Sequence, residues 1–191
     1  MRKTLLLVFT LLIGGCDKNK SGLHNPIVVS SIDSICLLSA PFSDPILKSD
    51  LEMIYIDDSY LNERRKQWIL GDSIAKYCTS NELEELAIFH KSQAIRYVAF
   101  QLLLKKNPHR AVNILINDID NNDSIIAIQF DEGFPRLIAS LKVDLVQGGR
   151  KQYNISIKDS IAVDEAVLKS KNKSKFHYYP YLQKRLFPQK E

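Results

Sequence analysis

The chain has 191 residues, of which 45% are hydrophobic and 25% are charged, and its formal net charge is +4. This length suits one domain with tails rather than several domains, and the hydrophobic share is sufficient for a real core. The charge is unevenly spread, because residues 17–168 carry a balance of −4 whereas residues 169–191 contain seven Lys or Arg and one Glu, a balance of +6.

The amino-terminal residues have the layout of an export signal. Arg2 and Lys3 form a positive head, and residues 5–13 form an apolar run of nine residues. A transmembrane helix needs about 20 apolar residues, so this run is too short to stay in a bilayer. A positive head, a short apolar body and two glycines together predict a secretory signal peptide over residues 1–15.

A cysteine follows the two glycines directly, in the order Ile13-Gly14-Gly15-Cys16. This segment resembles the lipobox of bacterial lipoproteins, in which the cysteine receives a diacylglycerol and becomes residue one after cleavage. The resemblance implies a lipid anchor on Cys16, and two acyl chains give stable membrane attachment. The alternative is a plain signal peptide with an incidental cysteine. We therefore expect a membrane-anchored protein of the bacterial cell envelope, with the choice between inner and outer membrane left open.

Polar residues with Gly and Pro follow this cysteine and predict a flexible tether over residues 16–31. The segment PIVVSSIDSICLLSA, residues 26–40, is apolar and β-branched, which favours a strand or a packed extended segment. Cys36 and Cys78 are the two cysteines that remain if Cys16 carries lipid, so they are the available pair for a disulfide. Two buried thiols that behave as small apolar side chains are the alternative.

Apolar residues recur at helical spacing through most of the region 32–168. The first such stripe consists of Leu61, Arg64, Trp68, Ile69, Ile74, Ala75 and Cys78, with Gly71 expected to weaken or break the helix. Further helices are predicted to begin at a Thr79/Glu82 capping box, at Ser92, at Pro108, at Pro135 and at Asp159. Apart from residues 26–40, only residues 124–130, SIIAIQF, show a partial alternation of apolar and polar residues as in a strand. The predicted fold is therefore all-α, built from short antiparallel helical hairpins.

The segment HKSQAIRYVAFQLL, residues 90–103, resembles the second helix of a HEAT-like repeat. The resemblance rests on Ile95, Arg96 and Ala99, where an apolar residue precedes an Arg and a small residue follows three positions later. It implies that Ala99 lets neighbouring helices approach closely and that Arg96 carries its charge out to a turn. The next unit, residues 118–130, has an acidic turn but no Arg at the matching place, and the pattern does not define its second helix. A HEAT-like array and a compact helical bundle both remain open.

The chain lacks the familiar catalytic signatures, and no enzyme activity, cofactor or metal site is expected from it. It contains no G-x-S-x-G, H-E-x-x-H or C-x-x-C motif and no glycine-rich phosphate loop. Asp118, Asp120 and Asn122 match the first ligand positions of an EF-hand loop, but Asp123 replaces the required Gly and Gln129 the required Glu. His90 is interpreted as a turn residue rather than a ligand.

Residues 169–191 form a basic tail that also contains five aromatic residues. Cations with aromatic rings suit nucleic acid in a cytosolic protein, but export makes nucleic acid a poor partner. The tail is expected to be attracted to anionic lipid head groups. In the alternative, KSKNKSK is a solvated linker and YYPYLQKRLF is a short helix that caps the core.

These features favour a lipid-anchored helical module that binds another protein of the envelope, since helical repeats commonly bind macromolecules on an extended face. Two alternatives stay open. One is an envelope enzyme whose site is not visible in the sequence, and the other is an immunity-type inhibitor lipoprotein.

Overall fold

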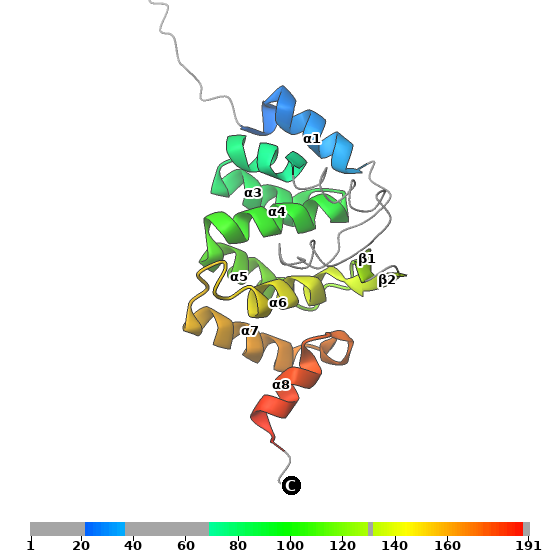
Figure 1. Cartoon of the computed structure of the whole chain (residues 1–191), viewed down its shortest axis with the longest axis vertical. Coiled ribbons are helices and arrows are strands. Elements are labelled where there is room, and N and C mark those ends of the chain that lie inside the picture. Colours follow the sequence, from blue (N-terminus) through cyan, green and yellow to red (C-terminus); the bar gives the residue numbers. More distant parts are fainter. Residues whose placement is uncertain (1–21, 37–68, 130–131, 189–191) are drawn as a thin grey trace, which may run out of the picture.

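The computed structural model describes residues 22–36, 69–129 and 132–188, and it is predominantly helical (Figure 1). Its elements in chain order are η1 (Gly22–His24), α1 (Pro26–Cys36), a helical segment over 69–77, α3 (Ser80–Phe89), α4 (Gln93–Lys106), α5 (Pro108–Asn117), β1 (Ser124–Gln129), β2 (Glu132–Leu137), α6 (Ile138–Gly148), α7 (Ile157–Lys169), η3 (Lys173–Lys175) and α8 (Tyr179–Leu186). The predicted all-α fold is confirmed, with a two-stranded antiparallel hairpin added to it. Among the described residues, no helix combines the length and apolar composition needed to cross a bilayer.

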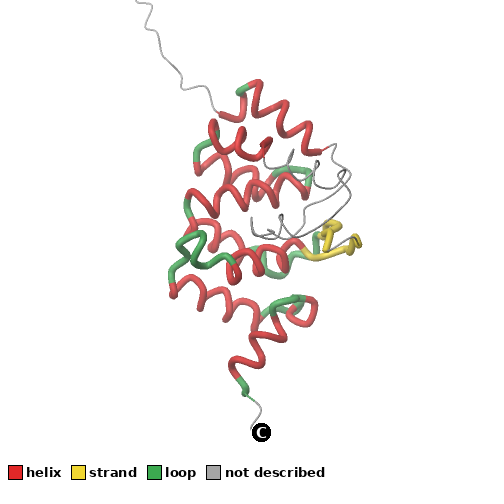
Figure 2. The backbone as a smooth tube through the Cα atoms, viewed as in Figure 1, coloured by secondary structure: helices red, strands yellow, loops and turns green. Residues whose placement is uncertain are grey.

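The helices stack along the long axis of the molecule, with α1 at one end and α8 at the other (Figure 1). Helix α3 packs most extensively against α4, α5 lies between α3 and α7, and α4 contacts both α1 and α6. The hairpin projects from one side of the stack, where it joins α5 to α6 (Figure 2). Fully buried side chains from five successive helices form the core: Leu83, Leu103, Leu115, Leu141 and Val163.

Three of the predicted helix starts are confirmed by their capping contacts. Thr79 and Glu82 form the capping box, in which the backbone N–H of Thr79 donates to the Glu82 carboxylate over 2.7 Å. Ser92 caps α4, and Pro108 begins α5 where its missing N–H costs nothing. Each start depends on residues within one turn of each other.

The first described helix corrects the prediction for residues 26–40. Helix α1 begins at Pro26, inside the range predicted as a tether, and its side chain at Val28 is fully buried. Val28, Ser31 and Ile35 are buried at helical spacing, which the β-branched composition of the segment had masked. The sequence prediction of an extended segment is therefore wrong for residues 26–36.

Three smaller corrections concern helix termini and breaks. Ser156, rather than Asp159, caps α7, because the backbone N–H of Asp159 donates to Ser156 Oγ over 3.0 Å. The helical segment 69–77 continues through Gly71 without a break. Helix α6 begins at Ile138 and not at Pro135, because Pro135 is paired with β1 as part of β2. The predicted stripe residues Leu61, Arg64 and Trp68 lie outside the described residues.

Cys36 and Cys78 are free thiols in the structure, Cys36 exposed and Cys78 buried. The alternative of a buried thiol therefore describes Cys78 and not Cys36. Burial raises the pKa of the Cys78 thiol to about 11, and the neighbouring Glu82 adds to this rise. Cys78 is consequently protonated at neutral pH and packs as an apolar side chain.

The basic tail is folded over residues 169–188. Asn172, Phe176 and Leu182 are buried, and η3 occupies part of the stretch that was expected to be a solvated linker. The short helix predicted within YYPYLQKRLF is confirmed as α8. The linker interpretation is wrong because buried contacts hold this stretch against the preceding helices.

Candidate functional site

The three residues of the repeat signature lie on α4. Ile95 and Ala99 are each 1% exposed, whereas the side chain of Arg96 keeps 17% of its surface exposed. Ile95 and Ala99 are four positions apart and therefore share one face of the helix, which is buried. Arg96 lies at the edge of this face, where a long side chain can cover apolar surface and still present its charge.

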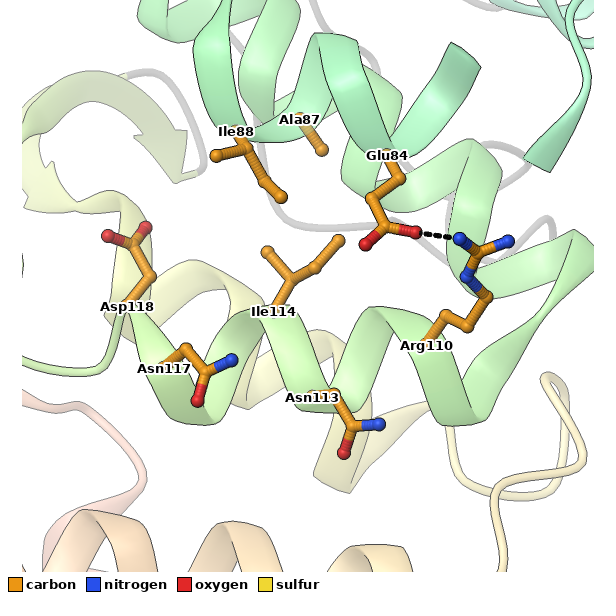
Figure 3. Close-up of a pocket in the computed structure, with 8 residues that line it drawn as sticks. All are labelled: Glu84, Ala87, Ile88, Arg110, Asn113, Ile114, Asn117 and Asp118. Carbon is orange, nitrogen blue, oxygen red and sulfur yellow. Dashed lines mark ion pairs between the residues drawn. The ribbon is translucent and has the colours of Figure 1, made fainter. Parts of the chain in front are cut away.

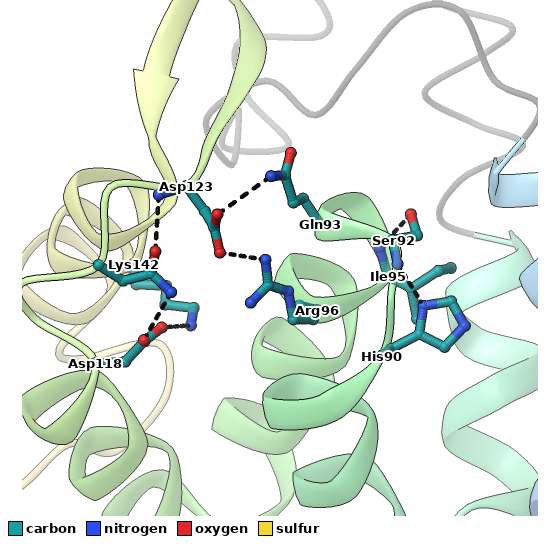
Figure 4. A network of polar contacts seen from close by, with 9 residues as sticks. His90, Ser92, Gln93, Ile95, Arg96, Asp118, Asp123 and Lys142 are labelled. Atoms are coloured by element: carbon teal, nitrogen blue, oxygen red, sulfur yellow. Dashed lines mark hydrogen bonds and ion pairs between the residues drawn. The ribbon is translucent and has the colours of Figure 1, made fainter.

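Arg96 contacts a carboxylate in the turn that follows α5 (Figure 4). Its guanidinium donates a hydrogen bond to Asp123, and Gln93 donates to the other oxygen of that carboxylate over 3.3 Å. The hydrogen bond from Arg96 lowers the pKa of the Asp123 carboxyl below its usual value, although partial burial opposes this effect. This pair thus holds α4 against the turn between α5 and β1.

A buried lysine extends this network to α6 (Figure 4). Lys142 is 1% exposed, and its Nζ lies 3.3 Å from Asp118 Oδ2 and 5.1 Å from the centre of the Phe100 ring. Burial lowers the pKa of Lys142, and the nearby Asp118 carboxylate partly restores it. Asn121 donates a further hydrogen bond to Asp118 over 2.9 Å. The cation is therefore paired in a site from which water is largely excluded.

The acids that resemble an EF-hand loop point to different partners. Asp118 pairs with Lys142, whereas Asp120 Oδ1 accepts hydrogen bonds from Ser170 Oγ over 2.7 Å and from the backbone of Lys171 over 3.0 Å. Within the described ranges, no three His, Cys, Asp or Glu side chains gather where they could hold a metal ion. The turn connects helices to one another and to the carboxyl-terminal segment.

Strand β2 contains an arginine, two residues before α6 begins, that the sequence analysis did not single out. Arg136 precedes Ala139 by three positions, as Arg96 precedes Ala99. Arg136 pairs with Asp144 at 2.5 Å, and His177 Nδ1 lies 3.7 Å from the same carboxylate. The segment 118–130, which has no Arg at the matching place, contains β1 (Ser124–Gln129) instead of a second helix, and Arg136 follows it. The spacing from Arg to Ala was the signal that could have revealed it.

Two histidines occupy defined positions at helix ends. His90 ends α3, as its interpretation as a turn residue implies, and its Nδ1 accepts a hydrogen bond from the backbone of Ser92 over 3.0 Å. His109 lies in the first turn of α5 and places Nδ1 2.8 Å from Asp159 Oδ1. Its Nε2 lies 3.4 Å from Asn113 Nδ2. The hydroxyl of Ser156 donates to the other oxygen of the Asp159 carboxylate over 2.8 Å, so the imidazole and the hydroxyl bind the same carboxylate.

A groove lies between α3 and α5 and encloses a volume of about 440 Å³ (Figure 3). Its apolar floor consists of Ala87, Ile88 and Ile114. One end is closed by an ion pair between Glu84 and Arg110. The exposed carboxamides of Asn113 and Asn117 and the carboxylate of Asp118 form the remaining rim.

The sequence analysis did not identify this groove, although part of it follows a recognisable pattern. Arg110, Asn113 and Asn117 recur at three- and four-residue steps, so they share one side of α5. The opposing residues belong to α3, and their position beside α5 depends on how the two helices pack. An apolar floor with hydrogen-bonding groups at its rim suits the binding of a side chain together with neighbouring polar groups.

Comparison of the chain with protein-family models, with curated proteins and with solved structures finds no match. The arguments about function therefore rest on the residues and geometry described above.

Proposed function

We propose that this chain is a lipoprotein, anchored through acyl chains on Cys16, whose helical array binds another protein of the bacterial envelope. The observation that carries the proposal is the groove between α3 and α5. It combines the buried apolar side chains Ala87 and Ile114 with exposed carboxamides on Asn113 and Asn117. A carboxamide offers both a donor and an acceptor, which matches the polar groups of a polypeptide.

The proposal includes a HEAT-like relationship between the pairs α3–α4 and α5–α6. Support comes from the equal spacing of Arg96 to Ala99 and of Arg136 to Ala139, and from the aspartate that binds each arginine. Helical units that repeat in this way stack into an extended surface, and such surfaces commonly bind other macromolecules. Fold alone does not determine function, so the groove itself is the object of the test.

Position-specific photocrosslinking in intact cells tests the proposed binding face. A photoreactive amino acid replaces Asn113 or Asn117 in the groove, or the exposed Gln152 as a control on a different part of the surface. We expect one discrete crosslinked protein, identified by mass spectrometry, from both groove positions and not from position 152. The same product from all three positions, or no product from the groove, would contradict the proposal.

A matched pair of substitutions on α3 separates loss of the groove from loss of the fold. Ile88 lines the groove, whereas the adjacent Phe89 is 77% exposed and lies outside it. Ile88→Arg should abolish the crosslink by filling the groove with a charged side chain, and Phe89→Arg should leave it unchanged. Equal loss in both variants would place the binding site elsewhere.

A further inference from the structure

The carboxyl-terminal segment 169–188, here termed the C-terminal cap, is fastened to the array by an aspartate from a distant turn. Asp120 accepts hydrogen bonds from Ser170 Oγ and from the backbone of Lys171, and its carbonyl accepts one from Asn172 Nδ2 over 3.1 Å. The bond from Ser170 lowers the pKa of the Asp120 carboxyl, so this contact is intact at neutral pH. The cap therefore holds its side chains in defined positions.

A second aspartate holds the other half of the cap. Asp164 of α7 accepts hydrogen bonds from Tyr178 Oη over 3.0 Å and from the guanidinium of Arg185. Burial, reinforced by Asp164, raises the pKa of Tyr178 to about 12, which keeps this phenol a donor at neutral pH. Phe176 and Leu182 of the cap are buried, 2% and 0% exposed.

The cap has an excess of positive charge. Residues 169–188 contain six Lys or Arg and no Asp or Glu. Lys169 lies 3.8 Å from Glu165, and Arg185 pairs with Asp164. Among the described residues, no acid forms an ion pair with the four exposed lysines that remain: Lys171, Lys173, Lys175 and Lys184. These four charges are therefore available to a partner of negative charge.

Large apolar side chains are exposed on the same segment. Tyr181 is 61% exposed, Leu186 is 44% exposed and Phe187 is 71% exposed. Aromatic side chains are favoured at the boundary between a bilayer and water, and lysines are attracted to anionic head groups. An anionic membrane surface offers both kinds of contact, whereas an acidic polypeptide would leave the exposed rings without an apolar partner.

The distance between the cap and the proposed anchor determines how the protein would lie on a membrane. Gly22, where the described structure begins, lies six positions after Cys16, so an acyl anchor would hold η1 within about 22 Å of the membrane. Helix α8 lies at the opposite end of the long axis from α1 (Figure 1). A second contact at α8 would therefore keep the array along the membrane instead of upright on its tether.

We propose that the C-terminal cap is a second membrane contact, which binds anionic phospholipids through Lys171, Lys173, Lys175 and Lys184 together with its exposed apolar side chains. The acyl anchor at one end and the cap at the other then orient the array parallel to the bilayer. The part of this proposal that concerns orientation rests on the proposed lipid anchor. The affinity of the cap for anionic lipid does not depend on that anchor.

Lysine footprinting of the full-length lipidated protein on vesicles tests this contact. A water-soluble acylating reagent labels exposed lysines, and mass spectrometry measures the rate at each position on vesicles of phosphatidylcholine with or without phosphatidylglycerol. Each lysine near an anionic surface strengthens binding to that surface by about fivefold, which corresponds to about 1 kcal/mol. We expect labelling of Lys173, Lys175 and Lys184 to slow by about fivefold or more on anionic vesicles. In about 1 M salt, where the Debye length is about 3 Å, most of this protection should disappear.

Internal controls come from the same labelling reaction. Lys91 and Lys105 lie outside the cap, one before α4 and one in its last turn, so their labelling should slow less than that of the cap lysines. Cap lysines that react equally fast on neutral and anionic vesicles would overturn the proposal. Clustering of the vesicles would overturn the parallel orientation, because it would show that the cap contacts a second membrane.

Two matched triple variants complete the experiment. K173Q/K175Q/K184Q should remove the protection of Lys171, whereas K91Q/K105Q/K151Q removes the same charge elsewhere and should preserve it. Continued protection of Lys171 in the first variant would contradict the role of these lysines, provided that circular dichroism shows a native helix content. Failure of the protein to sediment with neutral vesicles would instead overturn the acyl anchor, which distinguishes that failure from failure of the cap.

Discussion

Arg96 of α4 donates a hydrogen bond to Asp123, which lies 27 positions later in the chain, in the turn before β1. The side chains are 17% and 34% exposed, so the pair is shielded from water only in part. Arg96 lies on α4, whereas Asp123 follows α5. This contact therefore stabilises the position of α4 relative to the turn after α5, rather than either helix alone.

Removal of the Arg96 side chain should therefore destabilise the array. A hydrogen bond between charged groups contributes about 1.5–3 kcal/mol, and solvent screening reduces the expected loss for Arg96→Ala to about 1–2 kcal/mol. Urea unfolding of R96A, D123A and the double variant measures the coupling between them. A coupling close to zero would show that the arginine acts through the packing of its stem and not through Asp123.

The same pair predicts a dependence of stability on pH. Arg96 holds the pKa of the folded-state Asp123 carboxyl below its usual value of 3.8, so the pair's stabilisation is complete above that value. It is lost as the pH falls from 3.8 through the lowered pKa. The difference in urea midpoint between wild type and Asp123→Asn should therefore be constant near neutral pH and shrink in acid. An unchanged difference in acid would argue against an ionic interaction.

Enlargement of Ala99 should overfill the core. This side chain is 1% exposed, and extra methyl groups in a packed core cost about 1–3 kcal/mol. Ala99→Leu is expected to lower the urea midpoint, whereas Gln101→Leu, at a half-buried position of the same helix, should change it little. An unchanged midpoint for Ala99→Leu would mean that the packing around position 99 is loose enough to accept the larger side chain.

The buried pair of Lys142 and Asp118 should respond asymmetrically to substitution. Lys142→Met replaces a desolvated cation with an apolar side chain that can contact the Phe100 ring, which leaves stability unchanged or higher. Asp118 is 35% exposed and can be solvated without its partner. Asp118→Ala, by contrast, leaves the lysine buried and unpaired and should cost about 1–3 kcal/mol. Equal losses in both variants, measured by urea unfolding, would show that the pair is net stabilising.

Burial of Lys142 also has a consequence at alkaline pH. The pKa of this amine is lower in the folded state than its usual value of 10.5, so the unfolded chain binds more protons between the two values. Stability of the wild type should therefore rise with pH in that interval relative to Lys142→Met. A difference between the two proteins that does not change with pH would rule out titration of this group.

Replacement of Gly71 by alanine should stabilise the protein. A Cβ at this position would lie 3.8 Å from Val98 and Leu102, which is ordinary contact, and loss of glycine's flexibility contributes about 0.4–1 kcal/mol. Gly149→Ala is the matched contrast, because a Cβ there would lie 2.5 Å from the carbonyl of Leu145 and from the Tyr153 ring. We expect opposite shifts of the melting temperature. A loss of stability in Gly71→Ala would indicate a close contact from outside the described residues.

Lipidation predicts a specific requirement for Cys16. Cys16→Ser should leave the precursor uncleaved and prevent incorporation of radiolabelled palmitate, because no thiol remains to accept the diacylglycerol. Cys36→Ser should remain labelled, since Cys36 is an exposed free thiol in the folded domain. Normal maturation and membrane retention of Cys16→Ser would falsify the lipobox interpretation.

Helix starts could be predicted from the sequence where the deciding contacts are local. The Thr79 and Glu82 side chains cap their own helix, Ser92 bonds to an amide three residues later, and Pro108 needs no partner at all. Such contacts form between neighbours in the chain regardless of the surrounding fold. Helix α1 was missed because its β-branched residues favour a strand, and burial against the other helices overrides that preference.

The sequence alone determined the pattern of Ile95, Arg96 and Ala99, but the tertiary structure decided what these residues contact. The β1–β2 hairpin delays the next helix to Ile138, and Arg136 lies in β2, two residues before that helix begins. A hairpin between two helices shifts every later residue, so counting along the chain from Arg96 could not predict where the second spacing from Arg to Ala lies.

The sequence by itself determined the helical character of the domain and the basic carboxyl terminus, since each depends on composition or on spacing within a few residues. Tertiary structure decided which side chains the acids contact. Asp118 pairs with Lys142, 24 positions later, and Asp120 bonds to Ser170, 50 positions later. The groove likewise depends on the packing of α3 against α5. These pairs form because whole apolar faces must be buried against one another, and that packing brings together polar residues whose separation in the chain contains no local signal.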